Sequence, residues 1–248
     1  MNKTLKKVLI GLGATIVLGL LIIGGFLYKF NYETSKMHPT ETGKIVDNIF
    51  AIKDEFVNMY LLQDSNNYIA IDAGKDLDVI SAELKKLNIN PDMVIAVLLT
   101  HSDPDHVAGL PLFKNAKIYL AKAEVPMLTG EKQKIPGVSN KISRNDYTLL
   151  EDHQTLIIGN EKSFSILTKG HTSGSMCFQV NDKYLFTGDI LSLENGKIGH
   201  SVKFLDMDHE MATKSISIIT NLPNVEYIFT AHFGYTNNYK NAVSDWKE

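Results

Sequence analysis

Two histidines and two aspartates fall within six residues in the stretch Leu98-Leu99-Thr100-His101-Ser102-Asp103-Pro104-Asp105-His106. An unbroken apolar run at 93–99 leads into these residues and has the length of a strand that is buried on both faces. Side chains at the end of such a strand are held rigidly and stay reachable from solvent. The stretch therefore predicts a buried strand that ends in a functional site.

Three later segments repeat this arrangement, with a side chain that can bind metal directly after an expected strand. They are Lys169-Gly170-His171-Thr172, Phe186-Thr187-Gly188-Asp189 and Phe229-Thr230-Ala231-His232. Taken singly, such a histidine is more often a hydrogen-bonded structural residue than a ligand. Asp103, before Pro104, and Asp189, after Gly188, also have local alternatives, namely starting a helix and closing a turn.

Apolar periodicity and turn residues indicate short strands and helices along the rest of the chain. We expect strands at 45–52, 58–63, 68–72, 93–99, 118–121, 163–167, 176–180, 184–186 and 225–229. We expect helices at 76–87, 104–112, 122–128 and 208–221. This alternation predicts an α+β fold in which helices cover sheets. Cys177 lies inside an expected strand and is predicted to be a buried small hydrophobic residue.

In their order along the chain, these segments resemble the motif series of the metallo-β-lactamase fold superfamily. That series is His-x-His-x-Asp-His, followed at a distance by His, Asp and His. The resemblance implies a four-layer αβ/βα sandwich over residues 44–248. It includes Ile71-Asp72-Ala73-Gly74, in which Asp72 matches a residue that supports the ligands from outside the metal site. The metal ligands that it implies are His101, Asp103, Asp105, His106, His171, Asp189 and His232.

The resemblance further implies two divalent metal ions, with zinc as the expected metal. The first ion is assigned to His101, Asp103 and His171, and the second to Asp105, His106 and His232, with Asp189 bridging them. Asp105 and Asp189 are the expected catalytic residues. A hydroxide held between the ions would attack an ester, thioester, lactone, amide or phosphoester in a small-molecule substrate. The residues that bind this substrate do not follow from the sequence.

Asp103 departs from the family pattern, which has a histidine at this position. A carboxylate oxygen in place of an imidazole nitrogen shifts the metal preference from zinc towards iron or manganese. The shorter side chain also leaves open a weak or absent first metal. A diiron redox protein and a metal-binding domain with little turnover are therefore the alternatives to a hydrolase.

The composition excludes several other classes of protein. Of the 248 residues, 44% are hydrophobic and 21% are charged, which is ordinary for a globular domain. The single cysteine, Cys177, excludes an intramolecular disulfide and any multi-cysteine zinc site. The formal net charge is −3, and residues 1–28 carry three lysines and no acidic residue. The remaining residues therefore have a net charge of −6 and lack the basic surface that a nucleic-acid partner requires. The oligomeric state is left open.

Residues 8–28 contain no charged side chain and are long enough to cross a hydrocarbon core of about 30 Å. We predict a transmembrane helix at 8–28, after a cytoplasmic N-terminus at 1–7 and before a juxtamembrane linker at 29–43. Because Lys3, Lys6 and Lys7 precede the segment, the positive-inside rule places the 44–248 domain outside the cytoplasm of a single-pass membrane protein. A cleaved signal peptide is the competing interpretation, although the apolar run is unusually long and lacks an Ala-x-Ala site.

Overall fold

The computed structural model describes residues 2–247, which form two compact units, one ending at Met37 and the other beginning at His38. The first unit contains the helix α1 (Lys3–Thr34), in which the Thr4 amide donates to Asn2 Oδ1 at 3.1 Å and so caps the N-terminus. Its segment Leu9–Thr34 is long and apolar enough to span a membrane, a property shared by signal sequences. Residues 29–34, which the sequence places in the linker, are part of this helix.

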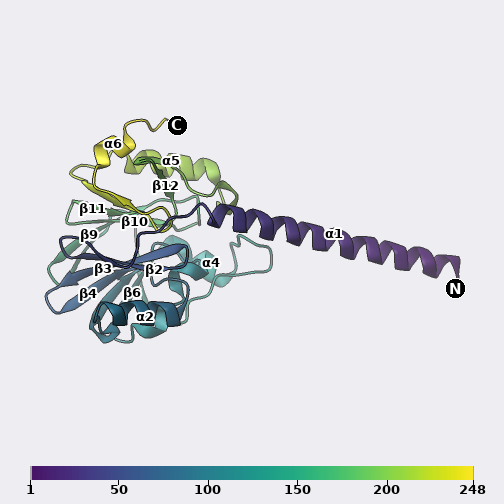
Figure 1. The fold of residues 1–248 in the computed structure, drawn as a ribbon, viewed down its shortest axis with the longest axis horizontal. Helices are drawn as coiled ribbons and strands as arrows, with labels where there is room; N and C mark the ends of the chain where they lie inside the picture. Colours follow the sequence, from purple (N-terminus) through teal and green to yellow (C-terminus); the bar gives the residue numbers. More distant parts are fainter. Residues whose placement is uncertain (1, 248) are drawn as a thin grey trace. The chain divides into compact units, whose positions relative to one another are not determined.

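The second unit consists of two large sheets that face each other (Figure 1). Within residues 38–247, the first sheet is ordered β1 (Gly43–Val46), β2 (Ile49–Asp54), β3 (Val57–Asp64), β4 (Asn67–Ile71), β5 (Val94–Leu98), β6 (Lys117–Ala121) and β7 (Tyr147–Leu150). The second is ordered β15 (Tyr235–Thr236), β14 (Tyr227–Phe229), β11 (Tyr184–Phe186), β10 (Met176–Val180), β9 (Glu161–Leu167) and β8 (Thr155–Ile158). A separate hairpin pairs β12 (Leu191–Glu194) with β13 (Lys197–His200).

Short helices connect these strands. The α-helices are α2 (Leu77–Lys86), α3 (Pro104–Val107), α4 (Val125–Thr129), α5 (His209–Ile219) and α6 (Tyr239–Val243). The 3-10 helices are η1 (Pro91–Met93), η2 (Leu110–Leu112), η3 (Lys122–Glu124) and η4 (Lys203–Leu205).

Two hydrophobic cores fix the order of the layers. Because successive side chains of a strand point to opposite faces, Tyr60 enters the core between the sheets while Leu61 enters the core on the outer face of the first sheet. The inner core includes Phe178 and Phe186 from the second sheet, and the outer core includes Ile80 from α2. In Figure 1, α5 and α6 lie beyond the second sheet. The predicted α+β four-layer sandwich is confirmed.

The parallel strand pairs determine where functional side chains can meet. β4, β5, β6 and β7 run parallel to one another, as do β11 and β14 in the other sheet. The two sheets are joined at the carboxyl ends of these strands, where the Met176 amide donates to the Thr100 carbonyl at 2.8 Å and the Asn58 amide to the Ala231 carbonyl at 2.7 Å. Segments that follow β4, β5, β11 and β14 therefore share one end of the sandwich.

Three expected elements are divided in the structure, and one of them, the helix expected at 122–128, becomes η3 and α4. The single strand expected at 45–52 is divided into β1 and β2, because Asp47 adopts a left-handed conformation with φ of 46° and turns the chain. The single helix expected at 104–112 is divided into α3 and η2. Between them, Gly109 passes so close to the first sheet that a Cβ atom would lie 2.2 Å from the Ala73 carbonyl oxygen.

Candidate metal centre

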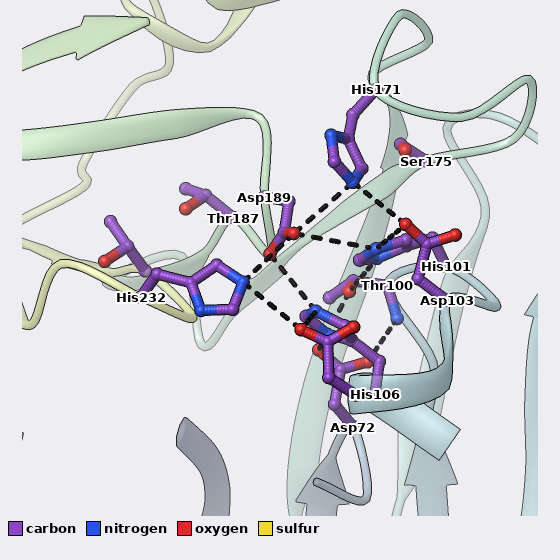
Figure 2. A network of polar contacts seen from close by, with 12 residues as sticks. Asp72, Thr100, His101, Asp103, His106, His171, Ser175, Thr187, Asp189 and His232 are labelled. Atoms are coloured by element: carbon purple, nitrogen blue, oxygen red, sulfur yellow. Dashed lines mark hydrogen bonds and ion pairs between the residues drawn. The ribbon is translucent and has the colours of Figure 1, made fainter. Parts of the chain in front are cut away.

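All seven predicted ligand residues lie at this end of the sandwich. His101, Asp103, Asp105 and His106 follow β5, His171 lies between β9 and β10, and Asp189 and His232 follow β11 and β14. Figure 2 shows the histidine rings converging on Asp189 and Asp103. The buried strand end that the sequence predicts therefore does lead into a cluster of metal-capable side chains.

The first predicted trio comprises His101, Asp103 and His171. Asp103 Oδ2 lies 3.5 Å from His101 Nε2 and 3.2 Å from His171 Nε2. Ligand atoms bonded to one ion at about 2.1 Å are themselves roughly 3 to 3.5 Å apart, so this spacing suits a single ion. Asp103 precedes α3, yet its side chain makes no capping hydrogen bond there. Asp103 therefore stands at the start of α3, as the local alternative has it, but its carboxylate faces the two histidines.

The second predicted trio comprises Asp105, His106 and His232. Asp105 Oδ2 lies 3.7 Å from His106 Nε2 and 3.6 Å from His232 Nε2. Asp105 has the most exposed of the three carboxylates, with 22% of its side chain accessible, whereas His106 is fully buried. The second trio is thus open to solvent on the side of Asp105.

Asp189 lies between the trios. Its Oδ1 atom is 3.2 Å from His106 Nε2, and its Oδ2 atom is 3.1 Å from His232 Nε2 and 3.3 Å from His171 Nε2. One carboxylate therefore reaches histidines of both trios, as a bridging ligand would. The alternative role of closing a turn after Gly188 does not describe this side chain.

The cluster contains buried polar atoms that lack hydrogen-bond partners within residues 2–247. They include His101 Nε2, His106 Nε2 and Asp189 Oδ1. Leaving such an atom unpaired costs about 1–3 kcal/mol, so three that face one space indicate a bound group that they share. Imidazole nitrogen and carboxylate oxygen are ligands of zinc and similar divalent ions. The donor set therefore fits metal ions.

The other ring nitrogen of each histidine is held by a partner outside the cluster. The Nδ1 partners are Thr100 Oγ1 for His101 (3.0 Å), Asp72 Oδ2 for His106 (2.9 Å), Asp206 Oδ1 for His171 (3.3 Å) and the Phe56 carbonyl for His232 (2.7 Å). A carbonyl or carboxylate oxygen can only accept, so Nδ1 of His106, His171 and His232 donates. When neutral, each ring then presents the lone pair of Nε2 to the site, which is the arrangement of metal-binding histidines.

Asp72 is hydrogen-bonded to the segment that follows β5. Its Oδ1 accepts from the Thr100 amide at 2.7 Å, and its Oδ2 accepts from the Thr100 hydroxyl at 2.8 Å and from His106 Nδ1 at 2.9 Å. Because the Thr100 hydroxyl donates to Asp72, its oxygen is left to accept from His101 Nδ1. One carboxylate thus orients ligands of both trios.

Charges within the cluster perturb its titratable groups. Burial opposes ionisation of Asp103, but Lys134 and His101 outweigh burial and hold the pKa of the carboxyl well below its ordinary value. Burial likewise opposes a charge on His106, but Asp189 and Asp105 raise the pKa of its imidazole well above its ordinary value. The cluster is therefore a strongly anionic site that attracts protons or metal cations.

Sequence reasoning missed four residues that contact the ligand segments. Lys134 pairs with Asp103 Oδ2, and Asn140 Nδ2 donates to Asp103 Oδ1 at 2.8 Å. Glu124 is fully buried and accepts from the Ser102 amide at 3.0 Å and the Gly174 amide at 2.9 Å. Asp206 joins His171 to His209, whose Nδ1 lies 2.8 Å from Asp206 Oδ2. These residues lie far along the chain from their partners, and no local pattern marks them.

Comparison with known proteins gives one family. A family model described as the metallo-beta-lactamase superfamily matches residues 52–232. The chain is 36% identical over 140 residues to the Bacillus subtilis (strain 168) protein named "Probable polyketide biosynthesis zinc-dependent hydrolase PksB", covering 54% of this chain and 55% of that protein. It is 28% identical over 182 residues to a hydroxyacylglutathione hydrolase of Shewanella halifaxensis, covering 73% of this chain and 63% of that protein.

Solved structures share the fold at lower sequence identity. The BLEG-1 B3 metallo-beta-lactamase is 25% identical with a TM-score of 0.58, covering 76% of this chain and 93% of that chain. A metallo-beta-lactamase family protein of Thermus thermophilus is 17% identical with a TM-score of 0.62, covering 82% of this chain and 79% of that chain. A B3 enzyme described as the first with an active-site glutamic acid is 16% identical with a TM-score of 0.65, covering 88% of this chain and 89% of that chain.

Proposed function

Because this chain belongs to the metallo-beta-lactamase superfamily, we propose that it is a membrane-anchored, metal-dependent hydrolase of small molecules. The observation that carries the proposal is the cluster itself, in which four histidine Nε2 atoms and three carboxylates face one another at a buried strand end. Asp103, Asp105 and Asp189 supply oxygen and the histidines supply nitrogen. No other group of residues in the described chain offers a comparable set of donors.

The proposed ligands are those of the two trios with Asp189 between them. Zinc is the expected metal, since curated relatives are named zinc-dependent hydrolases, and iron or manganese are the alternatives because Asp103 adds an oxygen ligand. When bound, such an ion acts as a Lewis acid and lowers the pKa of a coordinated water towards about 7. The protein holds these ligands rigidly, because the Nδ1 atom of each histidine is hydrogen-bonded and both sheets fix the strand ends.

Asp105 and Asp189 are the proposed catalytic residues, with different parts to perform. Asp105 has the more exposed carboxylate and lies beside His106 and His232, so it can accept a hydrogen bond from the attacking water and hold it. Asp189 is nearly buried and reaches both trios, so it fixes their spacing. Asp72 stays outside the reaction and orients ligands.

Thioesters are the substrate class that the relatives favour. Several curated relatives are named hydroxyacylglutathione hydrolase, and an acylated glutathione is a thioester. The chain spans only 55% of the PksB protein and 63% of the Shewanella halifaxensis enzyme, so the substrates of either are carried over as a proposal. Esters, lactones, amides and phosphoesters belong to the same hydrolytic chemistry and serve as comparison substrates.

The test uses the full chain, purified in detergent, stripped with a chelator and reloaded with zinc. We expect release of a free thiol from an acylated glutathione, and slower turnover of a chromogenic ester, lactam and phosphodiester. The Asp105→Asn variant should lose about 10²-fold to 10⁴-fold of the activity while remaining folded. Glu151→Gln, at an exposed surface carboxylate, is the matched control. A metal-loaded protein that turns over none of these substrates would contradict the proposal.

The helix α1 is proposed to anchor this activity to the cell membrane. Its segment Leu9–Thr34 has the length and composition of a membrane span, and its large apolar side chains, such as Leu20 and Leu21, are exposed to the surroundings. Three lysines at the N-terminal end favour a cytoplasmic N-terminus and an extracytoplasmic catalytic unit.

A further inference from the structure

Lys134 reaches into the first ligand trio from the loop between α4 and β7. Its ammonium pairs with Asp103 Oδ2 and lies 2.8 Å from His171 Nε2. Only 18% of the lysine side chain is exposed, so the ammonium is largely enclosed by the site. A cation of the protein itself therefore contacts two of the three atoms expected to bind the first ion.

The ammonium and a metal ion would use the same electron pairs. His171 Nδ1 is directed at Asp206 Oδ1 at 3.3 Å, so Nε2 holds the lone pair of the neutral ring, and Lys134 donates to it. A zinc–nitrogen bond of about 2.0–2.1 Å would require that lone pair. Asp103 is occupied as well, because Asn140 Nδ2 donates to its Oδ1 at 2.8 Å while Lys134 contacts its Oδ2. Binding of the first ion therefore requires Lys134 to leave.

The second trio has no such competitor. Within residues 2–247, no lysine or arginine forms an ion pair with Asp105 or Asp189, whose ion-pair partners are histidines. Of the three unpartnered atoms of the cluster, His106 Nε2 and Asp189 Oδ1 face this side, 3.2 Å apart, and His101 Nε2 belongs to the first trio. The structure thus offers one position that is ready for an ion and one that already holds a cation.

The charges agree with this division. With neutral histidines, the three carboxylates and the single ammonium give the cluster a net charge of −2, which one divalent ion balances. A second divalent ion placed beside the ammonium would leave excess positive charge in a largely buried site, and uncompensated buried charge is costly. Displacing Lys134 into solvent removes that excess but breaks its contacts with Asp103 and His171.

We propose that Lys134 is a tethered cation that occupies the first metal position, so that the chain binds one ion tightly through Asp105, His106, His232 and Asp189. The first position fills only when Lys134 is displaced. This inference rests on the proposed function, because it assumes that the cluster is a metal site. It replaces the expectation of two equivalent ions with one resident ion and one position that Lys134 controls.

The test measures zinc stoichiometry and affinity, with elemental analysis and competition against a chromophoric chelator, on the full chain in detergent. For the wild type we expect one equivalent of zinc that binds tightly and a second equivalent whose affinity is lower by about tenfold or more. Lys134→Met keeps the length of the side chain and removes its charge, so both equivalents should bind tightly. Lys132→Met, at an exposed lysine of the same loop, is the matched control and should behave as the wild type.

Two equivalents of similar affinity in the wild type, unchanged in Lys134→Met, would overturn the role of Lys134 and leave the proposed hydrolase standing. If neither the wild type nor any folded variant binds zinc tightly, the proposed function itself is overturned. Asp103→Ala provides a second variant, since loss of a ligand of the first position should leave the single tight equivalent of the wild type in place. Loss of that equivalent in Asp103→Ala would also count against the inference.

Discussion

Asp72 adopts the left-handed backbone conformation, with φ of 61°, directly after β4. A non-glycine residue in this region carries a cost of about 1–3 kcal/mol, which the surroundings must offset. Here the carboxylate is held by the Thr100 amide, the Thr100 hydroxyl and His106 Nδ1. The strained turn places a carboxylate behind two ligand histidines, so the strain is tied to the geometry of the site.

Asp72→Asn tests this supporting role at the residue scale. The amide keeps the shape of the side chain, but its NH₂ group cannot accept from Thr100 or His106, so the imidazole of His106 loses its orientation. We expect zinc affinity to fall by about 10-fold to 100-fold. Chelator competition measures this change, and circular dichroism checks that the fold is kept. Asp92→Asn, at a surface turn, is the control. An unchanged affinity in a folded Asp72→Asn protein would show that Asp72 does not support the metal site.

The pH dependence of metal binding follows from His106. Asp189 and Asp105 outweigh burial and raise the pKa of its imidazole well above 6.5, so the metal-free protein holds a proton there that an ion must displace. Zinc affinity should therefore rise with pH and keep rising above pH 6.5, with release of protons on binding. Calorimetry in buffers of different ionisation enthalpy measures both quantities. An affinity that is constant over this range would contradict the prediction, and His153→Ala, at an exposed histidine, should not alter the profile.

The residues of the candidate metal centre could be singled out from the sequence because each follows a short apolar run within a few positions. Lys134 and Glu124 could not, since their partners in the site lie 31 and 22 positions away along the chain. A lysine in a polar loop and a glutamate after a strand have no pattern that distinguishes them from surface residues. Their roles come from tertiary contacts alone.

At the scale of elements, strands with a buried face were predictable and the short edge elements were not. β3, β4, β5 and β10 lie close to their predicted ranges because their burial imposes continuous or alternating apolar residues. The hairpin β12–β13 was missed, although its turn carries a sequence signal in Asn195-Gly196, both with positive φ. β15, at only two residues, is too short to carry a periodicity.

Close packing between elements also depends on Gly188, at the end of β11. Its φ is +54°, and a Cβ atom would lie 2.6 Å from Thr100 Oγ1. The glycine lets the segment that carries Asp189 approach the segment that carries His101. The Gly-Asp pair in the sequence is therefore explained by the contact of two strand ends from different sheets.

Glu124, at the end of η3, joins two of the ligand loops. It accepts from the Ser102 amide and hydroxyl at 3.0 and 2.6 Å, from the Thr172 hydroxyl at 2.7 Å and from the Gly174 amide at 2.9 Å. Ser102 is next to His101, and Thr172 is next to His171. One buried carboxylate therefore fixes the distance between the two histidines of the first trio.

Glu124→Gln tests this connection between elements. The amide nitrogen that replaces one carboxylate oxygen would face two donors, leaving them buried and unpaired. We expect the free energy of unfolding to fall by about 1–3 kcal/mol, measured by denaturant titration of the full chain in detergent. The zinc affinity of the first position should also fall, because the loops of His101 and His171 lose their shared hydrogen bonds to Glu124. Glu151→Gln serves again as the exposed control, and equal stability of the two variants would refute the role of Glu124.

At the scale of the whole molecule, the two units differ in how their apolar side chains are placed, buried in one and exposed in the other. The unit that begins at His38 has its own hydrophobic cores and contains every residue of the candidate metal centre. The unit that ends at Met37 presents exposed leucine, isoleucine and phenylalanine side chains along α1, which water does not favour. The proposed bilayer around α1 would account for this difference, and the membrane proposal can be tested separately from the proposed hydrolysis.

The topology can be tested because the chain has a single cysteine, Cys177, which is fully buried and whose thiol pKa is raised to about 12 by burial. An introduced cysteine is therefore the one readily reactive thiol. We expect a membrane-impermeant maleimide to label Glu41→Cys on intact cells, since the Glu41 side chain is 84% exposed and lies on the proposed outer side. Asn2→Cys should react only after the cells are permeabilised, because it precedes the basic residues on the proposed inner side.

The wild-type chain is the control, and it should remain unlabelled in both conditions while Cys177 stays buried. The reverse pattern, with Asn2→Cys labelled on intact cells and Glu41→Cys protected, would overturn the orientation but not the membrane span. Recovery of the Glu41→Cys protein in the soluble fraction, shortened at its N-terminus, would instead identify α1 as a cleaved signal. Each result places the metal centre in a definite compartment. That placement decides whether the ion is taken from the cytoplasmic pool or from the exterior, where the competition between Lys134 and a second ion depends on the metal concentration outside the cell.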